Sequence, residues 1–466
     1  MHEPEQDVYD FGDGGNDMSI FLDVVKYIKM AQEEDLLVLV RPSPYICSEW
    51  DFGGMPSWLL RYPGLVVRSS EPQFLERVRK YNNKLLPLFK ELQFTRGGPI
   101  IGFQIENEYG GLIEDGSPID MKYLLFLKDE FEKHNIVELL YTSDNPSIHG
   151  ERGAIPEVLQ TANFQTNPEN ELSLLKKFQP NKPLMVMEFW AGWFDHWFEH
   201  HHTTPVAGFS DTLDRILKFP SSVNLYMFHG GTNFGFLNGA NVKGDFPHYN
   251  APLSEAGDYT DKYRVCKELV EKYNKVITKL PPPPAESKKV TFPSIPITEQ
   301  MDYTQILENI GPEDRDVTDD VVSMEHLKIN NGNGQSYGYI IYRHSSGVKV
   351  KESSKLQIKD GVVHDMAIVL LDEERQTEIL TNQNQLKGFG YWETPNSVLN
   401  IESKTKKTKT LDILVENWGR VNFGLHSDFE QCKGLRKGTK ILFDNEHVKG
   451  WETFSLQFKS KWLRGK

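Results

Sequence analysis

Two glutamates follow directly after an apolar run in the first quarter of the chain. The stretch GGPIIGFQIENEYG, residues 97–110, has the glycine–proline break and apolar residues of a strand sealed inside a sheet, and it ends on Glu106 and Glu108. A carboxylate is costly to bury unless it is paired, hydrogen-bonded or open to a cleft. The simplest interpretation is a solvated strand end. The alternative is a site where carboxyl groups do acid–base or nucleophilic chemistry.

A third carboxylate has the same kind of position. In PLMVMEFWAGWFDHW, residues 183–197, Glu188 follows an apolar strand and is surrounded by Trp190, Trp193 and Trp197. These tryptophans would also be explained by simple core packing. However, aromatic faces stack on the C–H surfaces of sugar rings, and a carboxylate at the carboxyl end of a barrel strand can attack an anomeric carbon. The pattern therefore suits sugar chemistry.

Other polar residues also collect where apolar runs end. CSEW (47–50) follows LLVLVRPSPYI, and HGGTNFG (229–235) follows VNLYMF. If all these ends converge on one face, the site contains Glu49, Glu106, Asn107, Glu108, Glu188 and Tyr226. Crowding raises some carboxyl pKa values and lowers others, so that one acid and one nucleophile coexist at a single pH.

The elements that would position these residues alternate between strands and helices. The strand candidates are 36–42, 99–106, 137–143, 161–166, 183–189 and 223–229, and the clearest helix candidates are 20–31, 74–92 and 121–133. Near-continuously apolar strands in β-then-α units predict a parallel sheet covered by helices. This leaves a (β/α)8 barrel or an open doubly wound sheet. Since no GxGxxG motif follows a strand, the dinucleotide-binding version has no support.

The pattern of apolar and polar residues changes at KLPPPPAESKK, residues 279–289. Four consecutive prolines cannot continue a helix or lie in a central strand, so they predict a stiff extended linker. Beyond them, alternating strands with short polar turns predict an antiparallel β-sandwich. The predicted domains are 1–278 (α/β), 279–300 (linker) and 301–466 (all-β).

Composition limits the class of partner. The chain has 466 residues, enough for two or three domains, and its net charge of −14 argues against binding to a nucleic-acid backbone. No apolar run approaches the ~20 residues needed to span a membrane, and the start MHEPEQDVYDF is unlike a signal peptide. The chain has only three cysteines, so no disulfide framework is expected. It contains no N-x-[ST] sequon. Taken literally, these features are typical of a soluble cytosolic chain.

Five motifs together carry a resemblance to a known family. RPSPYICSEW, GGPIIGFQIENEYG, KPLMVMEFWAGWFDHW, NLYMFHGGTNFG and YNAPLSEAGDYT resemble the motifs of glycoside hydrolase family 35, the β-galactosidases, and especially its animal group. LVENWGRVNFG resembles that family's first β-domain, so the likeness runs from residue 2 to about 455. The resemblance implies a (β/α)8 barrel and removal of terminal β-linked galactose from glycans or glycoconjugates, without a cofactor.

The resemblance also implies roles for individual residues. Glu108 would be the general acid/base and Glu188 the nucleophile of a retaining double displacement, which requires the two carboxyl groups to be about 5–5.5 Å apart. Asn107 would bond the sugar near its 2-hydroxyl, and Glu106 would hold galactose hydroxyls. The other implied sugar-binding residues are Cys47, Ser48, Glu49, Tyr226 and Tyr249. Strand alternation puts Gln104, Glu106 and Glu108 on one side, so Asn107 needs a local kink to face the sugar.

Three features have simpler explanations. Cys47 suits a small buried residue as well as it suits the sugar site, and Cys266 lies on the apolar face of a helical segment. The run 199–202 contains three consecutive histidines, but consecutive side chains do not share a face, and the family's chemistry needs no metal. We therefore expect a loop at the rim of the cleft rather than a metal site.

The ends of the chain depart from the family pattern. In the family the acid lies on barrel strand 4 and the nucleophile on strand 7, whereas here they follow the second and fifth strand candidates. We therefore expect the first two barrel strands and the family's last galactose-binding-like domain to be absent. A full-length version would be lysosomal or secreted. The alternative functions are a catalytically inactive galactose-binding or interaction protein, and the same chemistry on another β-glycoside.

Overall fold

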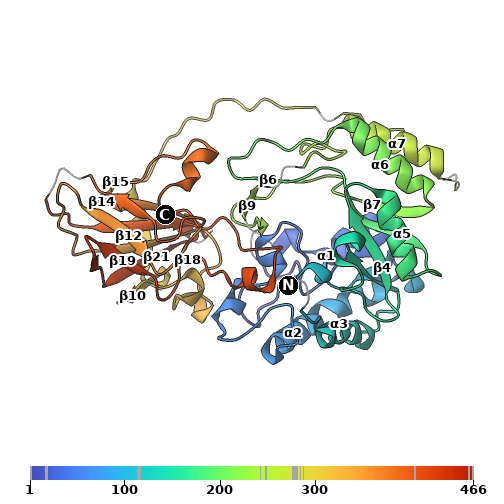
Figure 1. Cartoon of the computed structure of the whole chain (residues 1–466), viewed down its shortest axis with the longest axis horizontal. Coiled ribbons are helices and arrows are strands. Elements are labelled where there is room, and N and C mark those ends of the chain that lie inside the picture. Colours follow the sequence, from blue (N-terminus) through green and yellow to red (C-terminus); the bar gives the residue numbers. More distant parts are fainter. Residues whose placement is uncertain are drawn as a thin grey trace.

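The chain forms two halves that lie side by side, one built on a parallel sheet and the other on antiparallel sheets (Figure 1). The structure is a computed structural model. It describes residues 3–15, 19–112, 117–241, 243–246, 249–274, 276, 282–283, 285–286, 288–402, 406–459 and 462–463. Within these ranges, no helix has the length and apolarity that crossing a bilayer requires.

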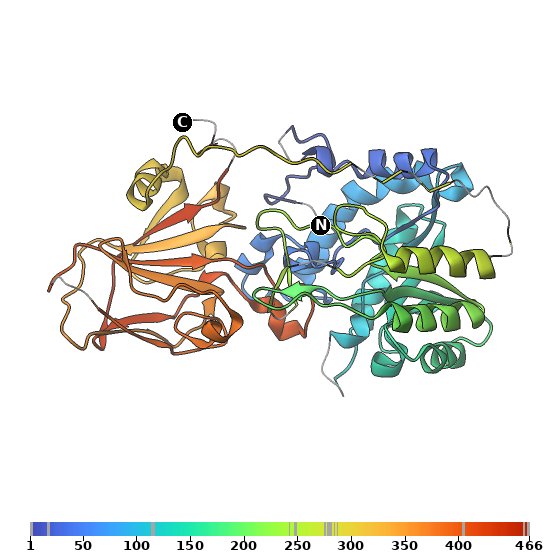
Figure 2. The same cartoon turned by 90° about the horizontal axis from the view of Figure 1, so that it is seen from above.

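The first half contains the six-stranded parallel sheet that the apolar runs predicted. Its strand order is β1-β2-β3-β4-β5-β7, with each strand parallel to the next. The strands are β1 (Val38–Val40), β2 (Ile100–Gln104), β3 (Leu139–Asp144), β4 (Leu159–Phe164), β5 (Leu184–Trp190) and β7 (Ser221–Tyr226). The sheet is curled as in a barrel, which favours the barrel-type fold over the doubly wound alternative (Figures 1 and 2).

Helices alternate with these strands and cover the outside of the sheet (Figure 1). They are α1 (Val24–Glu33), α2 (Pro72–Phe89), α3 (Met121–Lys133), α4 (Pro146–His149), α5 (Pro168–Phe178), α6 (Val206–Lys218) and α7 (Asp261–Tyr273). Helix α3 begins where Asp120 caps it, since the Asp120 side chain accepts from the Tyr123 amide, and it buries Leu127 and Phe131 at helical spacing. Cys266 in α7 is buried, as predicted.

The second half consists mainly of two antiparallel sheets, as predicted. The larger sheet has the order β10-β21-β11-β17-β14-β15, and the smaller has the order β16-β12-β19-β20. Their strands are β10 (Arg315–Thr318), β11 (Tyr339–His344), β12 (Lys355–Lys359), β14 (Met366–Leu371), β15 (Glu374–Arg375), β16 (Val398–Asn400), β17 (Leu411–Glu416), β19 (Lys440–Phe443), β20 (Glu446–His447) and β21 (Trp451–Leu456). Leu356, Ile413 and Trp451 are among the residues that share the core of this half.

The smaller elements include helix α8 (Tyr303–Asn309), the two-stranded sheet of β13 (Val363–His364) and β18 (Gly434–Leu435), and the three-stranded sheet of β6 (Asp195–His196), β8 (Ala240–Asn241) and β9 (Lys243–Phe246). Short 3-10 helices lie between the larger elements.

The segment between the halves is only partly described. Residues 288–302 are exposed and form neither helix nor strand, and Figure 2 shows them as an extended trace along one side of the molecule. Lys279, Leu280, Pro281, Pro284 and Ser287 lie outside the described residues. The stiffness expected from the four prolines and the predicted domain boundaries therefore stay predictions.

A loop of the second half packs into the core of the first half. It follows β17 and includes the short helix η11 (His426–Glu430), which lies against the first half in Figure 1. Val421 and Phe429 belong to the same buried cluster as Tyr45 and Phe52. The two halves are therefore joined by shared core packing as well as by the linker.

Arg420 is at the centre of the polar contacts across this seam. Its Nε donates to Oε1 of Glu325 (2.8 Å), and its Nη1 donates to Oδ2 of Asp51 (3.0 Å). The Arg420 and Glu325 side chains are 1% and 0% exposed. Both charges are thus removed from water, and their mutual attraction offsets part of the free energy that this desolvation costs.

Arg420→Met should destabilise the protein strongly, because it leaves the Glu325 carboxylate buried without its guanidinium partner. We expect a loss of about 3–5 kcal/mol in the free energy of unfolding, measured by urea denaturation. The control is Lys449→Met, which breaks an ion pair with Asp319 in which both side chains are at least half exposed, and should leave the midpoint unchanged. Equal midpoint shifts for the two variants would contradict the account.

Candidate active site

The predicted site residues gather at the carboxyl ends of the parallel strands. Glu188 lies within β5, in register with Asn163 of β4. The acidic residues and Asn107 are all buried, with exposed fractions of 8% for Glu49, 2% for Glu106, 2% for Asn107, 8% for Glu108 and 6% for Glu188. The alternative of a solvated strand end is therefore wrong.

The residues after β2 do not continue the strand. Glu106 and Glu108 have φ angles of 60° and 47°, in the left-handed region, so the alternation of side chains ends at Gln104. Gln104 Nε2 donates to Oδ1 of Asn107 (2.9 Å), so these two side chains lie together. The amide of Glu108 donates to the Ser143 carbonyl of β3 (2.9 Å) and fixes the turn. The kink predicted at Asn107 is present.

Glu106 is held by a buried ion pair. Arg68 donates to both carboxylate oxygens of Glu106, from Nη2 to Oε2 (2.7 Å) and from Nε to Oε1 (3.1 Å). The Tyr123 hydroxyl of α3 also donates to Oε1 (2.8 Å). The Glu106 side chain is thus directed toward α3, and its Oε2 also accepts from the Asn107 backbone amide (2.8 Å), whereas the Asn107 side chain lies with Gln104. The prediction that Gln104, Glu106 and Glu108 share one side is therefore wrong. Glu106 anchors the turn, and its predicted contact with galactose stays a prediction.

Glu108 lies in the environment of a proton donor. Burial raises the pKa of its carboxyl group far above the usual value, and the nearby charge of Glu188 raises this pKa further. The Asn163 side-chain amide donates to Oε1 of Glu108 (3.2 Å), which lowers the pKa by less. A carboxyl group held protonated near neutral pH can act as a general acid.

Glu188 lies between two hydrogen-bond donors. Arg41 Nη1 donates to its Oε1 (2.9 Å), and the indole N–H of Trp190 donates to its Oε2 (3.1 Å). The same Arg41 nitrogen also donates to Oδ1 of Asn107. Each of its two oxygens therefore accepts from one donor, and one of these donors is a guanidinium, so both bonds are made to groups that suit a carboxylate.

The sequence reasoning missed three partners of these carboxylates. Arg41 directly follows β1, and its only signal was a cation at the end of an apolar run. Arg68 lies in a loop, and Asn163 lies in a strand of unremarkable composition, so neither had a local signal.

Glu49 faces the two predicted tyrosines. The Tyr226 hydroxyl donates to its Oε2 (3.0 Å), and the Tyr249 ring meets the Tyr226 ring edge to face with centroids 6.3 Å apart. Burial raises the pKa of Glu49 to about 7, and the charge of Glu188 contributes to this shift. Burial and then the charge of Glu49 raise the pKa of both tyrosines, so they remain protonated donors.

Cys47 and Ser48 lie beside the same carboxylate. Cys47, Ser48 and Glu49 have consecutive φ angles of 60°, 58° and 48°, a strained turn of the kind that often accompanies function. Ser48 Oγ accepts from Arg41 Nη2 (3.3 Å), and the Cys47 sulfur accepts from the Asn422 amide of the second half (3.5 Å). Cys47 is buried, and neither of its two interpretations is tested by these contacts.

The histidine run forms hydrogen bonds with neighbouring carboxylates. His201 and His202 contact the two oxygens of Asp195 through Nδ1 (2.8 and 2.9 Å), and His196 contacts Glu199 (2.7 Å). Among the described residues, no group of three or more side chains has the arrangement of a metal site.

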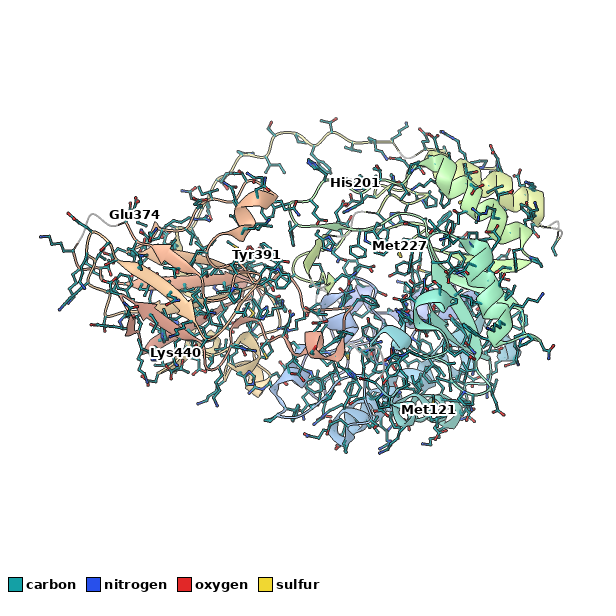
Figure 3. The ribbon with its side chains drawn as sticks, viewed as in Figure 1. Met121, His201, Met227, Glu374, Tyr391 and Lys440 are labelled. Atoms are coloured by element: carbon teal, nitrogen blue, oxygen red, sulfur yellow. The ribbon has the colours of Figure 1, made fainter. Side chains whose placement is uncertain are left out.

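A cavity of about 280 Å³ lies at the seam beside this segment, whose expected place at the rim of the cleft stays a prediction. It is lined by His196, Trp197, Glu199, Gln383, Asn384, Leu386, Lys387, Tyr391, Glu393 and Trp418. In Figure 3, Tyr391 lies on the side of the second half that faces the first half, and Met227 lies across from it, directly after β7. The wall of this cavity is aromatic and polar, as in sites that bind sugars.

A curled parallel sheet with paired carboxylates at the ends of its strands, joined to an antiparallel β half, defines a barrel-type glycoside hydrolase. The model of the family described as "Glycosyl hydrolases family 35" matches residues 1–273, and that of "Beta-galactosidase, first all-beta domain" matches residues 323–457. The chain belongs to glycosyl hydrolases family 35.

Several relatives are similar over nearly the whole chain. "Beta-galactosidase-1-like protein 2" of Homo sapiens is 38% identical and covers 100% of this chain, and "Beta-galactosidase-1-like protein 3" of Homo sapiens is 37% identical and covers 98%. "Beta-galactosidase" of Bos taurus is 36% identical and covers 94%. The matches span 68%, 65% and 64% of these relatives, so the chain has about two thirds of their length.

Glu49→Gln should stabilise the protein at alkaline pH. The folded-state pKa of about 7 lies above the reference value of 4.5, so ionised Glu49 opposes folding progressively as the pH rises from 4.5 to 7. The gain in unfolding free energy should therefore increase by about 1–2 kcal/mol between pH 5 and pH 8, measured by urea denaturation. Exposed Glu308→Gln on α8 is the control and should show no such increase. A gain that is larger at pH 5 than at pH 8 would contradict the assignment.

Proposed function

We propose that the chain is a retaining exo-β-galactosidase, which removes terminal β-linked galactose from glycans or glycoconjugates. The observation that carries the proposal is the contrast between two buried carboxyl groups at the strand ends. Glu108 is held protonated by burial, while Glu188 receives hydrogen bonds from Arg41 and Trp190. This contrast supplies an acid and a nucleophile at the same pH.

In the first step, a carboxylate oxygen of Glu188 attacks the anomeric carbon of galactose. The bond from that carbon to the departing oxygen breaks, and the proton of Glu108 moves to this oxygen. Asn107 points to the same side as Arg41 and would bond the sugar near its 2-hydroxyl. The products of this step are a galactosyl ester on Glu188 and the released aglycone.

In the second step, water opens the ester. Glu108, now ionised, takes a proton from the water, whose oxygen attacks the anomeric carbon as Glu188 leaves. Two inversions at one carbon give net retention. Glu108 returns to its protonated form, so the cycle needs no cofactor.

Galactose recognition is assigned to the residues around Glu49. Glu49, Tyr226 and Tyr249 would bond hydroxyl groups of the sugar, and Cys47 and Ser48 would line the same pocket. Glu106 has both oxygens engaged by Arg68 and Tyr123, so a contact with the sugar would add to its anchoring role. The aromatic cavity at the seam suits the part of the glycan beyond galactose.

The second candidate function is galactose binding without hydrolysis. One observation favours it: within the described residues, β1 and β7 each pair with only one other strand of the parallel sheet, which leaves the curl open. The third candidate is the same hydrolysis of another β-glycoside.

These candidates are separated by hydrolysis of aryl β-glycosides followed by proton NMR. We expect turnover of aryl β-galactoside at least tenfold faster than that of the β-glucoside, with the β-anomer of the sugar appearing first. First release of the α-anomer would contradict retention. Galactose binding without hydrolysis would support the second candidate, and faster turnover of the glucoside would support the third.

Glu108→Gln should separate substrates by their leaving group. A dinitrophenyl galactoside needs little protonation, so its kcat/KM, which reports the first step alone, should remain within about tenfold of the wild type. A galactosyl disaccharide has a poor leaving group and should lose about 10²–10⁴-fold. Initial rates on both substrates make the comparison. Equal losses would show that Glu108 is not the acid.

A further inference from the structure

Lys262 is a buried cation that the proposed mechanism does not use. It lies in the first turn of α7 and is only 2% exposed. Four acceptors around its Nζ share the three N–H groups: the carbonyls of Ala191 (2.8 Å) and Asn250 (2.7 Å), the Thr204 hydroxyl (2.6 Å) and the Asn250 side-chain oxygen. All these acceptors are neutral, and burial lowers the pKa of Lys262 to about 8. Burying a lysine among neutral oxygens costs free energy, because no carboxylate compensates the charge that is removed from water.

The acceptors of Lys262 are next to residues of the site. Ala191 directly follows Trp190, the residue whose indole bonds Glu188. The amide of Ala191 also donates to the carbonyl of Tyr226 (3.2 Å), which ties the end of β5 to the end of β7. Lys262 therefore bonds a residue that connects the ends of β5 and β7.

The second acceptor residue leads to the other tyrosine. Asn250 directly follows Tyr249, and both its backbone carbonyl and its side-chain oxygen accept from Lys262. Thr204 closes the group, because its amide donates to Asn250 Oδ1 (3.1 Å) and its hydroxyl donates to the Ala191 carbonyl (3.1 Å). The packing here is tight, since a Cβ added at Gly192 would lie 2.6 Å from the Asn250 carbonyl oxygen.

We propose that Lys262 is a positioning residue, whose ammonium group sets the distance between the strand end that carries Glu188 and the tyrosines that face Glu49. A single side chain reaches the segment after β5 and the segment that carries Tyr249, and through Ala191 it also holds Tyr226. This inference rests on the proposed function, because it concerns residues assigned to galactose recognition. It assigns Lys262 no contact with substrate.

Lys262→Met tests the proposal, because methionine keeps most of the length of the side chain but has no donor. We expect kcat/KM for an aryl β-galactoside to fall at least tenfold. In a Tyr249→Phe background, where the phenol is already absent, the same change should cost less than threefold. Lys267→Met, at a half-exposed position on the same helix, is the matched control and should leave kcat/KM within twofold. Equal losses in both backgrounds, or no loss, would overturn the proposal.

A second variant tests the proposal if Lys262→Met does not fold. Thr204→Val removes one acceptor and leaves the lysine in place, so a loss of two- to fivefold that disappears in the Tyr249→Phe background is expected. A loss that is the same in both backgrounds would overturn the proposal.

Failure of the proposed function is recognised separately. If the wild type does not hydrolyse the aryl galactoside, galactose affinity measured by NMR titration replaces kcat/KM in the same comparison. Lys262→Met should then weaken galactose binding only when Tyr249 is present. Unchanged affinity, or no galactose binding by the wild type, would overturn the positioning role.

Discussion

The buried pair between Arg68 and Glu106 is the interaction on which the geometry of the site depends. Both side chains are 1% exposed, and the pair holds the left-handed turn that carries Asn107 and Glu108. Arg68 Nη2 also donates to the carbonyl of Asn107 (2.8 Å). Without this cation, a carboxylate would remain buried behind the residue proposed as the acid, at a cost of several kcal/mol.

The same arginine links the site to the second half. Its guanidinium lies 3.5 Å from the centroid of the Tyr45 ring and 5.5 Å from that of Phe429, and its carbonyl contacts Nε2 of His426 (3.2 Å). Phe429 and His426 belong to η11, so the loop after β17 completes the environment of a residue behind β2. The β half therefore contacts and stabilises the catalytic half directly, in addition to being connected to it by the linker.

The periodic features of the fold were predictable from the sequence, because they depend on local patterns. Six apolar runs became six parallel strands, and the alternating runs after residue 300 became antiparallel sheets. The clustering of Glu49, Glu108 and Glu188 followed from the rule that parallel strands end at one edge. Roles within the cluster came from the resemblance to the family.

What could not be predicted depends on contacts between residues far apart in the chain. Glu106 was expected on the same side as Glu108, because alternation was extended through a turn whose left-handed residues carry no sequence signal. Arg41, Arg68 and Lys262 are cations whose burial is decided by partners far away in the chain; Glu188, for example, is 147 positions from Arg41. The packing of Phe429 into the first half has the same origin, since nothing in its own segment indicates a partner in another sheet.

The measurement that tests the central claim most directly is intact mass after incubation with an activated 2-deoxy-2-fluoro-galactoside, followed by peptide mapping. The fluorine slows both steps, and the good leaving group lets the galactosyl ester accumulate. The account predicts one adduct per chain, on the peptide that contains Glu188, and none in Glu188→Gln. Folded wild-type protein that carries no adduct, or carries it at a different residue, would contradict the assignment of Glu188 as the nucleophile.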